Sequence, residues 1–303
     1  MTRYLILNCD DFGQSRSANE AIQYLLEARL VSSASIMPPA PYFDEAAAWV
    51  RAHPGVSIGL HLTFTSEYRR LPWRSLTRAP SLEDETGYMH ETVADFERKA
   101  KAFDVWREMR AQFAKVKAAG VAITHVDNHM GSLYGMETGR SFLPLVFWES
   151  GRRGLPFRLF RKVDPNDHLL GGIEGVEARL KPAVALADLL GVAVPDYLLS
   201  HPYHVLPDET YEAFKRMMIE KIHALPEGIS EIYIHPAVES DELKSFLPEW
   251  RKRVWEFELA QDDDFRYALR DAGVELVDYR FVRKANARPR REGLRPLFRR
   301  WPL

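Results

Sequence analysis

The sequence of 303 residues predicts an α/β fold, a single-domain (β/α) barrel with seven or eight strands. Apolar strand-like segments alternate with segments whose apolar residues recur at helical spacing, and no linker interrupts them. Polar residues that bind metals or transfer protons follow four of the apolar segments, and active sites of β/α barrels are built at the carboxyl ends of several strands. An open doubly wound sheet is the alternative, but no glycine-rich phosphate loop follows the first strand.

The expected strands are the short apolar runs at residues 4–9, 31–37, 56–60, 121–124, 155–159, 197–199, 231–234 and 274–279. The expected helices are the periodic segments at residues 17–30, 43–52, 93–119, 142–152, 174–190, 211–224 and 250–272. A long loop at residues 64–90 follows the third strand, and loops of this length are usually functional or disordered. Because this loop carries Trp73 and other apolar side chains, we expect it to be ordered.

The composition narrows the class of protein. A hydrophobic content of 46% supports a sizeable core, and the formal net charge of −2 gives no indication of a nucleic-acid partner. The apolar runs are only as long as strands, so no membrane span is expected. Cys9 is the only cysteine, which excludes an intrachain disulfide. With no signal peptide visible, we expect a cytoplasmic protein.

The C-terminal segment differs from the rest of the chain. We expect residues 1–282 to form the barrel domain and residues 283–303 to form a basic extension. Between Arg283 and Arg300 there are eight lysines and arginines and one glutamate. Its interleaved basic and bulky apolar residues predict weak contact with an anionic membrane surface. The alternatives are a solvated tail or a segment packed on the partner subunit of a homodimer.

Metal-binding side chains follow the apolar runs in a repeated pattern. Asp10 and Asp11 end the first strand, His61 follows the third and His125 follows the fourth. Burying two adjacent carboxylates without compensation costs on the order of several kcal/mol, so a cation is expected beside them. One aspartate and two histidines are a common set for a divalent ion, and we predict Asp11, His61 and His125 as its ligands. His129 is the alternative to His125.

Adjacent residues at a strand end point in opposite directions, so Asp10 is expected to remain free of the ion. Asp10 can then take a proton from a water molecule as general base. His235 follows a separate strand and is the predicted general acid for a leaving amine. Arg158, also near a strand end, is expected to hold Asp10 ionised and oriented. These roles predict metal-assisted hydrolysis.

Other residues are expected to support this site. Asp127 and His129 are predicted to orient the ligands. His201 and His204 lie on one loop and are candidates for lining the substrate pocket, and Trp73 is the candidate for stacking on a sugar face. A single histidine at a strand end is more often structural, but four such strand ends together favour a metal centre.

Several motifs resemble those of a known family, the YdjC-like (ChbG/HpnK) carbohydrate deacetylases. The resemblance covers roughly residues 3 to 282, and the segments that carry it are Asn8–Gly13, Ser33–Met37, Gly59–Thr63, Thr124–His129, Leu155–Arg158 and Ile234–Pro236. It implies a (β/α) barrel distantly related to NodB-type polysaccharide deacetylases. It also implies one divalent metal held at Asp11, His61 and His125, with Asp10 as base and His235 as acid. Members of the family remove acetyl groups from amino sugars such as chito-oligosaccharides, or from a lipid-linked N-acetylglucosamine.

Three other functions remain open from the sequence. A deacylase of another amide would use the same residues. A metal-dependent sugar isomerase on a similar barrel would need more carboxylates and often a lysine, and no cluster of glutamates ends the strands. A sugar-binding protein without catalysis would not need two acids together with a distant histidine. Mixed oxygen and nitrogen ligands suit several divalent ions. Zn²⁺ and Mg²⁺ are the leading candidates among them.

Overall fold

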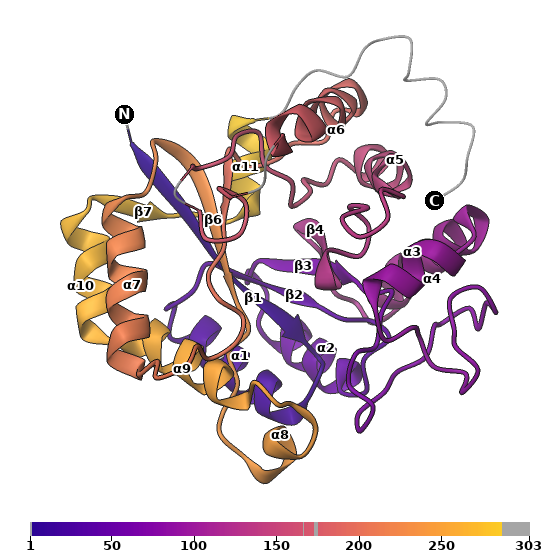
Figure 1. Cartoon of the computed structure of the whole chain (residues 1–303), viewed down its shortest axis with the longest axis horizontal. Helices are drawn as coiled ribbons and strands as arrows, with labels where there is room; N and C mark the ends of the chain where they lie inside the picture. Colours follow the sequence, from indigo (N-terminus) through magenta and orange to yellow (C-terminus); the bar gives the residue numbers. More distant parts are fainter. Residues whose placement is uncertain (1, 166, 173–174, 287–303) are drawn as a thin grey trace.

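The computed structural model describes residues 2–165, 167–172 and 175–286. Within these residues, parallel strands form one curled sheet in the order β4-β3-β2-β1-β6-β5, and β7 also pairs with β1 (Figure 1). The strands are β1 (Arg3–Phe12), β2 (Ser33–Ile36), β3 (Ile58–Leu62), β4 (His125–Asn128), β5 (Tyr197–Leu199), β6 (Gly228–Ile234) and β7 (Val274–Leu276). The prediction of an α/β fold around a curled parallel sheet is therefore confirmed.

Helices surround the strands on the outside of the curl (Figure 1). They are α1 (Arg16–Glu27), α2 (Phe43–Ala52), α3 (Val93–Lys99), α4 (Ala102–Ala118), α5 (Leu143–Arg153), α6 (Val176–Leu190), α7 (Tyr211–His223), α8 (Asp241–Phe246), α9 (Trp250–Gln261), α10 (Asp263–Asp271) and α11 (Tyr279–Ala285), with a short 3₁₀ turn, η1 (His129–Gly131), after β4. Among the described residues, no helix is long and apolar enough to cross a membrane.

Two expected helices are each divided in two. The segment at residues 93–119 breaks between α3 and α4, where Ala100 and Lys101 are extended and the Lys101 amide donates to Ser81 Oγ at 3.1 Å. The segment at residues 250–272 breaks at Asp262, whose carboxylate accepts from the backbone amide of Asp264 and so begins α10. At each break, one side-chain oxygen accepts a backbone N–H and so competes with the helical hydrogen bond.

The fourth strand lies further along the chain than expected. The apolar run at residues 121–124 precedes β4, whose four residues are all buried. His125 pairs with Gly59 and Asp127 pairs with His61, so both polar side chains belong to one face of the strand. His125 therefore begins the strand, and His129 follows its carboxyl end. The expected strand at residues 155–159 is reduced to one bridge, between Phe157 and Val126.

A layer of buried groups fills the sheet interior below the carboxyl ends. His125 stacks on the ring of Tyr279 with centroids 3.9 Å apart, and Tyr279, the first residue of α11, is fully buried. Gly59 leaves the space for His125, because a Cβ at residue 59 would collide with the imidazole. Tyr279 donates its hydroxyl to Glu231 on β6. Helix α11 thus contributes the Tyr279 ring to the interior of the sheet.

This helix also crosses the boundary expected at residue 282. Val282 is fully buried, α11 continues to Ala285, and the Asn286 side chain donates to the carbonyl of Val194 at 2.9 Å. The beginning of the expected basic extension is therefore part of the folded domain. From residue 287 onward, the basic extension that was expected to contact a membrane surface lies outside the described residues.

Candidate active site

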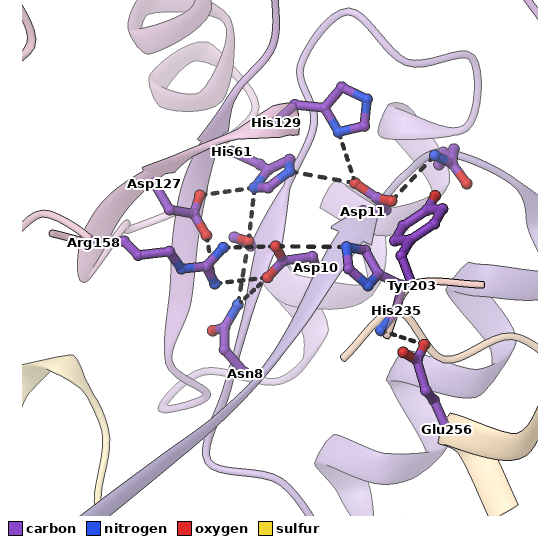
Figure 2. Close-up of polar contacts among 12 residues, drawn as sticks. Asn8, Asp10, Asp11, His61, Asp127, His129, Arg158, Tyr203, His235 and Glu256 are labelled. Atoms are coloured by element: carbon purple, nitrogen blue, oxygen red, sulfur yellow. Dashed lines mark hydrogen bonds and ion pairs between the residues drawn. The ribbon is translucent and has the colours of Figure 1, made fainter. Parts of the chain in front are cut away.

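Asp10 and Asp11 both reach the cavity at the carboxyl end of the sheet, although strand alternation predicts opposite directions. The register between β1 and β2 shifts between Cys9 and Phe12, and Asp11 has a φ of 67°, in the left-handed region. Such a conformation is disfavoured for a residue with a side chain and is typical of functional sites. The shift gives the two carboxylates different neighbours (Figure 2).

Asp10 is held by a bidentate pair with Arg158. The two guanidinium nitrogens donate to Asp10 Oδ2 at 2.6 Å and to Oδ1 at 2.7 Å. Asn8 donates to Oδ1 at 2.8 Å. Arg158 also forms ion pairs with Glu231 at 2.8 Å and with Asp127 at 3.0 Å. The predicted contact of Arg158 with Asp10 is therefore present, and it fixes the carboxylate in one orientation.

Asp11 faces two imidazole rings, and Figure 2 shows it between them. Its Oδ1 lies 3.3 Å from His61 Nε2 and 3.1 Å from His129 Nδ1. Ligand atoms of these three buried residues lie within 4.8 Å of one another, a geometry that can hold a metal ion. Burial opposes ionisation of Asp11, but the charge of His129 and hydrogen bonds to both rings hold the pKa of Asp11 well below its usual range.

The far nitrogen of each ring is bonded to a carboxylate. His61 Nδ1 donates to Asp127 at 2.9 Å, and His129 Nε2 donates to Glu67 at 2.9 Å. Burial lowers the pKa of His61, but the charge of Asp127 and its hydrogen bonds raise that pKa to about 9. The same balance, with Glu67 and Asp11, raises the pKa of His129 to about 10. A carboxylate behind each histidine is the usual arrangement around histidine ligands of metals.

His125 does not join this group. Its Nδ1 contacts Thr124 Oγ1 at 3.0 Å, and its Nε2 has no partner among the described residues. Burial, together with the charge of Arg158, lowers the pKa of His125 to about 3. The physical reason is the register of β4, which places His125 beside Gly59, two residues before the position that pairs with His61.

His235 stands on the other side of Asp10. Its Nε2 lies 4.0 Å from Asp10 Oδ2, and its backbone amide donates to Glu256 at 2.8 Å. The ring lies edge-on to Tyr203 and Tyr233, at 5.5 Å and 5.7 Å between centroids. Burial, with the charge of Arg253, lowers the pKa of His235 to about 4. The imidazole is therefore neutral near pH 7.

Three other predicted residues lie outside the cavity lining. Trp73 is only 3% exposed, donates its indole N–H to the carbonyl of Thr65, and packs edge-on against His129, so its ring is not free for a sugar. The His201 side chain is 3% exposed and donates to Glu256 at 2.7 Å, behind His235. His204 is exposed and contacts Glu249.

Sequence reasoning missed three acids that contact the site, namely the half-buried Glu67 and the buried Glu231 and Glu256. Glu231 interrupts an apolar run on β6, and a charge inside such a run is a signal that could have found it. Glu67 and Glu256 lie in a polar loop and on a charged helix, where nothing local distinguishes them. Their partners are distant along the chain.

The cavity above these residues has a volume of about 1120 Å³. Its polar end is formed by Asp10, Asp11 and His235, with Arg158 and Tyr203. From there it extends to apolar side chains of α5, α6 and β5 and of the preceding loops. These include Leu143, Phe160, Leu170, Leu180, Leu186 and Leu198. One end thus suits a polar group and the other an apolar group.

The family model described as "YdjC-like protein" matches residues 4–271. The chain belongs to the YdjC-like family. The match spans every element from β1 to α10, and it includes the residues around Asp10, Asp11, His61 and His129.

Two curated relatives of this YdjC-like protein are both named carbohydrate deacetylase. The relative from Thermus thermophilus is 29% identical, over 93% of this chain and 95% of its own. The relative from Geobacillus stearothermophilus is 26% identical, over 92% of this chain and 98% of its own. A solved structure described as a cellobiose-phosphate cleavage protein, from Enterococcus faecalis, aligns with a TM-score of 0.72 and 23% identity over 93% of this chain and 99% of its own. That likeness concerns the fold.

The low pKa of His235 makes stability depend on pH. The folded pKa of about 4 lies below the ordinary value of 6.5, so between these values the unfolded chain binds a proton that the folded protein does not. Protonation therefore favours unfolding, and stability falls as the pH falls from 6.5 to 4. We expect His235→Gln to remove this pH-dependent part of the free energy of unfolding, which is on the order of 3 kcal/mol over the whole range.

The measurement is urea unfolding of chelator-treated protein at pH 7, 6, 5 and 4. Wild type should lose more free energy of unfolding than the variant across this range. Parallel losses in the two proteins would show that His235 is protonated equally in the folded and unfolded states.

Proposed function

We propose that this protein is a metal-dependent N-deacetylase that removes the acetyl group from an acetylated amino sugar. One observation carries the proposal: Asp10, locked by Arg158, lies between His235 and the group of Asp11, His61 and His129. The names of the curated relatives support the same reaction class. A base, an acid and a cation-binding group thus meet at the end of a cavity large enough for a sugar.

For the metal, we propose Asp11, His61 and His129 as ligands, with His129 in place of His125. The donor set of one carboxylate and two imidazoles fits a divalent ion, and each imidazole has a carboxylate on its far nitrogen. When bound, the ion would polarise the acetyl carbonyl and lower the pKa of a water molecule. Zn²⁺ and Mg²⁺ remain the leading candidates.

The remaining chemistry belongs to the side chains. Asp10 takes a proton from the attacking water, while Arg158 keeps its carboxylate pointing at the cavity. The proton then passes to the leaving amine through His235, whose Nε2 lies 4.0 Å from Asp10. The low pKa of His235 suits this relay, because an imidazolium that forms there gives up its proton readily.

For the substrate, we propose an acetylated amino sugar with an apolar aglycone, such as a lipid-linked N-acetylglucosamine. Apolar side chains of α5, α6 and β5 line the cavity away from the catalytic groups. The lining also includes Met130, Met136 and Leu169, which are 47%, 54% and 57% exposed. A chito-oligosaccharide would leave the apolar side chains of this part of the cavity without an apolar partner.

We expect Asp10→Asn and His235→Ala to lower kcat by about 10²–10⁴-fold each, because each removes one proton-transfer step. The measurement is acetate release from N,N′-diacetylchitobiose. The metal content of each variant should equal that of wild type. Asp10→Asn with near wild-type kcat would remove Asp10 from the mechanism.

We expect Asp11→Ala, His61→Ala and His129→Ala each to lose the bound ion, and His125→Ala to retain it. The reason is that ligand atoms of the first three side chains lie within 4.8 Å of one another, whereas His125 belongs to no such group among the described residues. Elemental analysis of protein purified without chelator measures the metal content of each variant. Retention by His129→Ala together with loss by His125→Ala would reverse the assignment.

We expect Leu180→Ser, on α6, to lower kcat/KM for an octyl glycoside of N-acetylglucosamine about tenfold or more and to leave diacetylchitobiose unaffected. Burying a leucine-sized contact contributes roughly 1.5–3 kcal/mol. Leu190→Ser is the matched control, because Leu190 is equally buried on the same helix and is not a lining residue. Equal effects on both substrates would argue against an apolar aglycone.

A further inference from the structure

Glu67 lies in the loop between β3 and α3, and among the described residues its one polar partner is the imidazole of His129. Its Oε2 accepts the Nε2 proton of His129 at 2.9 Å. Its other oxygen, Oε1, is buried without a hydrogen-bond partner among the described residues, and its side chain is 13% exposed. No lysine or arginine of the described residues forms an ion pair with it. A carboxylate placed this way is costly to bury unless a positive charge compensates it.

Hydrogen bonds hold the loop next to Glu67. The Ser66 amide donates to the carbonyl of His90 at 2.9 Å, and Ser66 Oγ accepts from the Trp73 amide at 3.0 Å. The Trp73 indole donates to the carbonyl of Thr65 at 2.8 Å and also packs on the His129 ring, with centroids 5.8 Å apart. These contacts hold the backbone that directly precedes Glu67.

The contact decides which nitrogen of His129 is free. Because Glu67 holds the proton on Nε2, the lone pair of a neutral ring is on Nδ1, which faces Asp11 at 3.1 Å. Asp127 does the same for His61 from the opposite side, where it holds Nδ1 and leaves Nε2 toward Asp11. The two carboxylates therefore aim two lone pairs at one point.

We propose that Glu67 is a positioning residue of the metal centre, which sets the tautomer and orientation of His129. The inference rests on the metal site proposed above. It assigns the long loop at residues 64–90 a part in building the centre. Carboxylates behind metal-binding histidines typically contribute about 10–100-fold to metal affinity.

The test measures binding of Zn²⁺ to chelator-treated protein by competition with a chromogenic chelator, without any substrate. We expect Glu67→Ala to weaken Zn²⁺ binding about 10–100-fold. Glu67→Gln should recover part of this loss, because its amide oxygen still accepts the Nε2 proton but lacks the charge. Glu85→Ala is the matched control, because Glu85 is an exposed glutamate of the same loop.

A second readout separates positioning from folding. With Co²⁺ as the probe, the visible absorption bands report ligand geometry, and we expect Glu67→Ala to change them. The near-UV circular dichroism and Tm of the chelator-treated variant should match those of wild type. Wild-type affinity and Co²⁺ bands in Glu67→Ala would overturn the proposal. Weak binding accompanied by lost near-UV signal in both Glu67 variants would also overturn it, since the residue would then support the fold.

Asp11→Ala, measured alongside, keeps this result distinct from the proposed function. If Asp11→Ala binds Zn²⁺ as wild type does, the metal site itself is wrong. If Asp11→Ala loses binding and Glu67→Ala does not, the site stands and only the role of Glu67 is rejected.

Discussion

The site depends on the ion pairs that the guanidinium of Arg158 forms. It pairs with acids from three different strands, Asp10 on β1, Asp127 on β4 and Glu231 on β6. Each of these carboxylates is buried, and leaving any of them unpaired would cost several kcal/mol in order of magnitude. One buried cation thus makes it possible for parallel strands to bring their acids together in the sheet interior. The remaining negative charge, on Asp11 and Glu67, is left for the histidines and for a bound cation.

The register shift at Asp11 gives the carboxylates of Asp10 and Asp11 different partners. An unbroken strand would direct Asp10 and Asp11 to opposite faces. The left-handed backbone at Asp11 instead brings both into one cavity, where Arg158 holds Asp10 and the histidines hold Asp11. In the proposed reaction, the carboxylate paired with a guanidinium is the base, and the one that faces two imidazoles binds the cation. The strain at Asp11 is thus placed where the two roles must separate.

The fold class followed from the sequence because alternation of short apolar runs and helical periodicity is a local signal. Helix breaks at residues 100–101 and 262 were missed, since they depend on backbone amides that donate to Ser81 Oγ and to the carboxylate of Asp262. β4 was misplaced for a different reason. Its residues include His125 and Asp127, polar side chains that are buried because their partners come from elsewhere in the fold, so its hydrophobic pattern is reversed. Glu67 could not be found, because its partner lies 62 positions further along the chain.

The misplaced strand also explains why His125 lies apart from the group of Asp11, His61 and His129. Residues in a strand advance by about 3.3 Å each, so four residues separate positions by on the order of 13 Å. The first residue of β4 and the residue just beyond its end therefore place their side chains at different levels of the sheet. Gly59 and Tyr279 accept His125 as part of the packed interior, where a Cβ at residue 59 has no room. His129, beyond the strand, is instead held from the loop by Glu67 and Trp73. The two histidines of one short motif therefore belong to two layers, one that closes the sheet and one that faces the cavity.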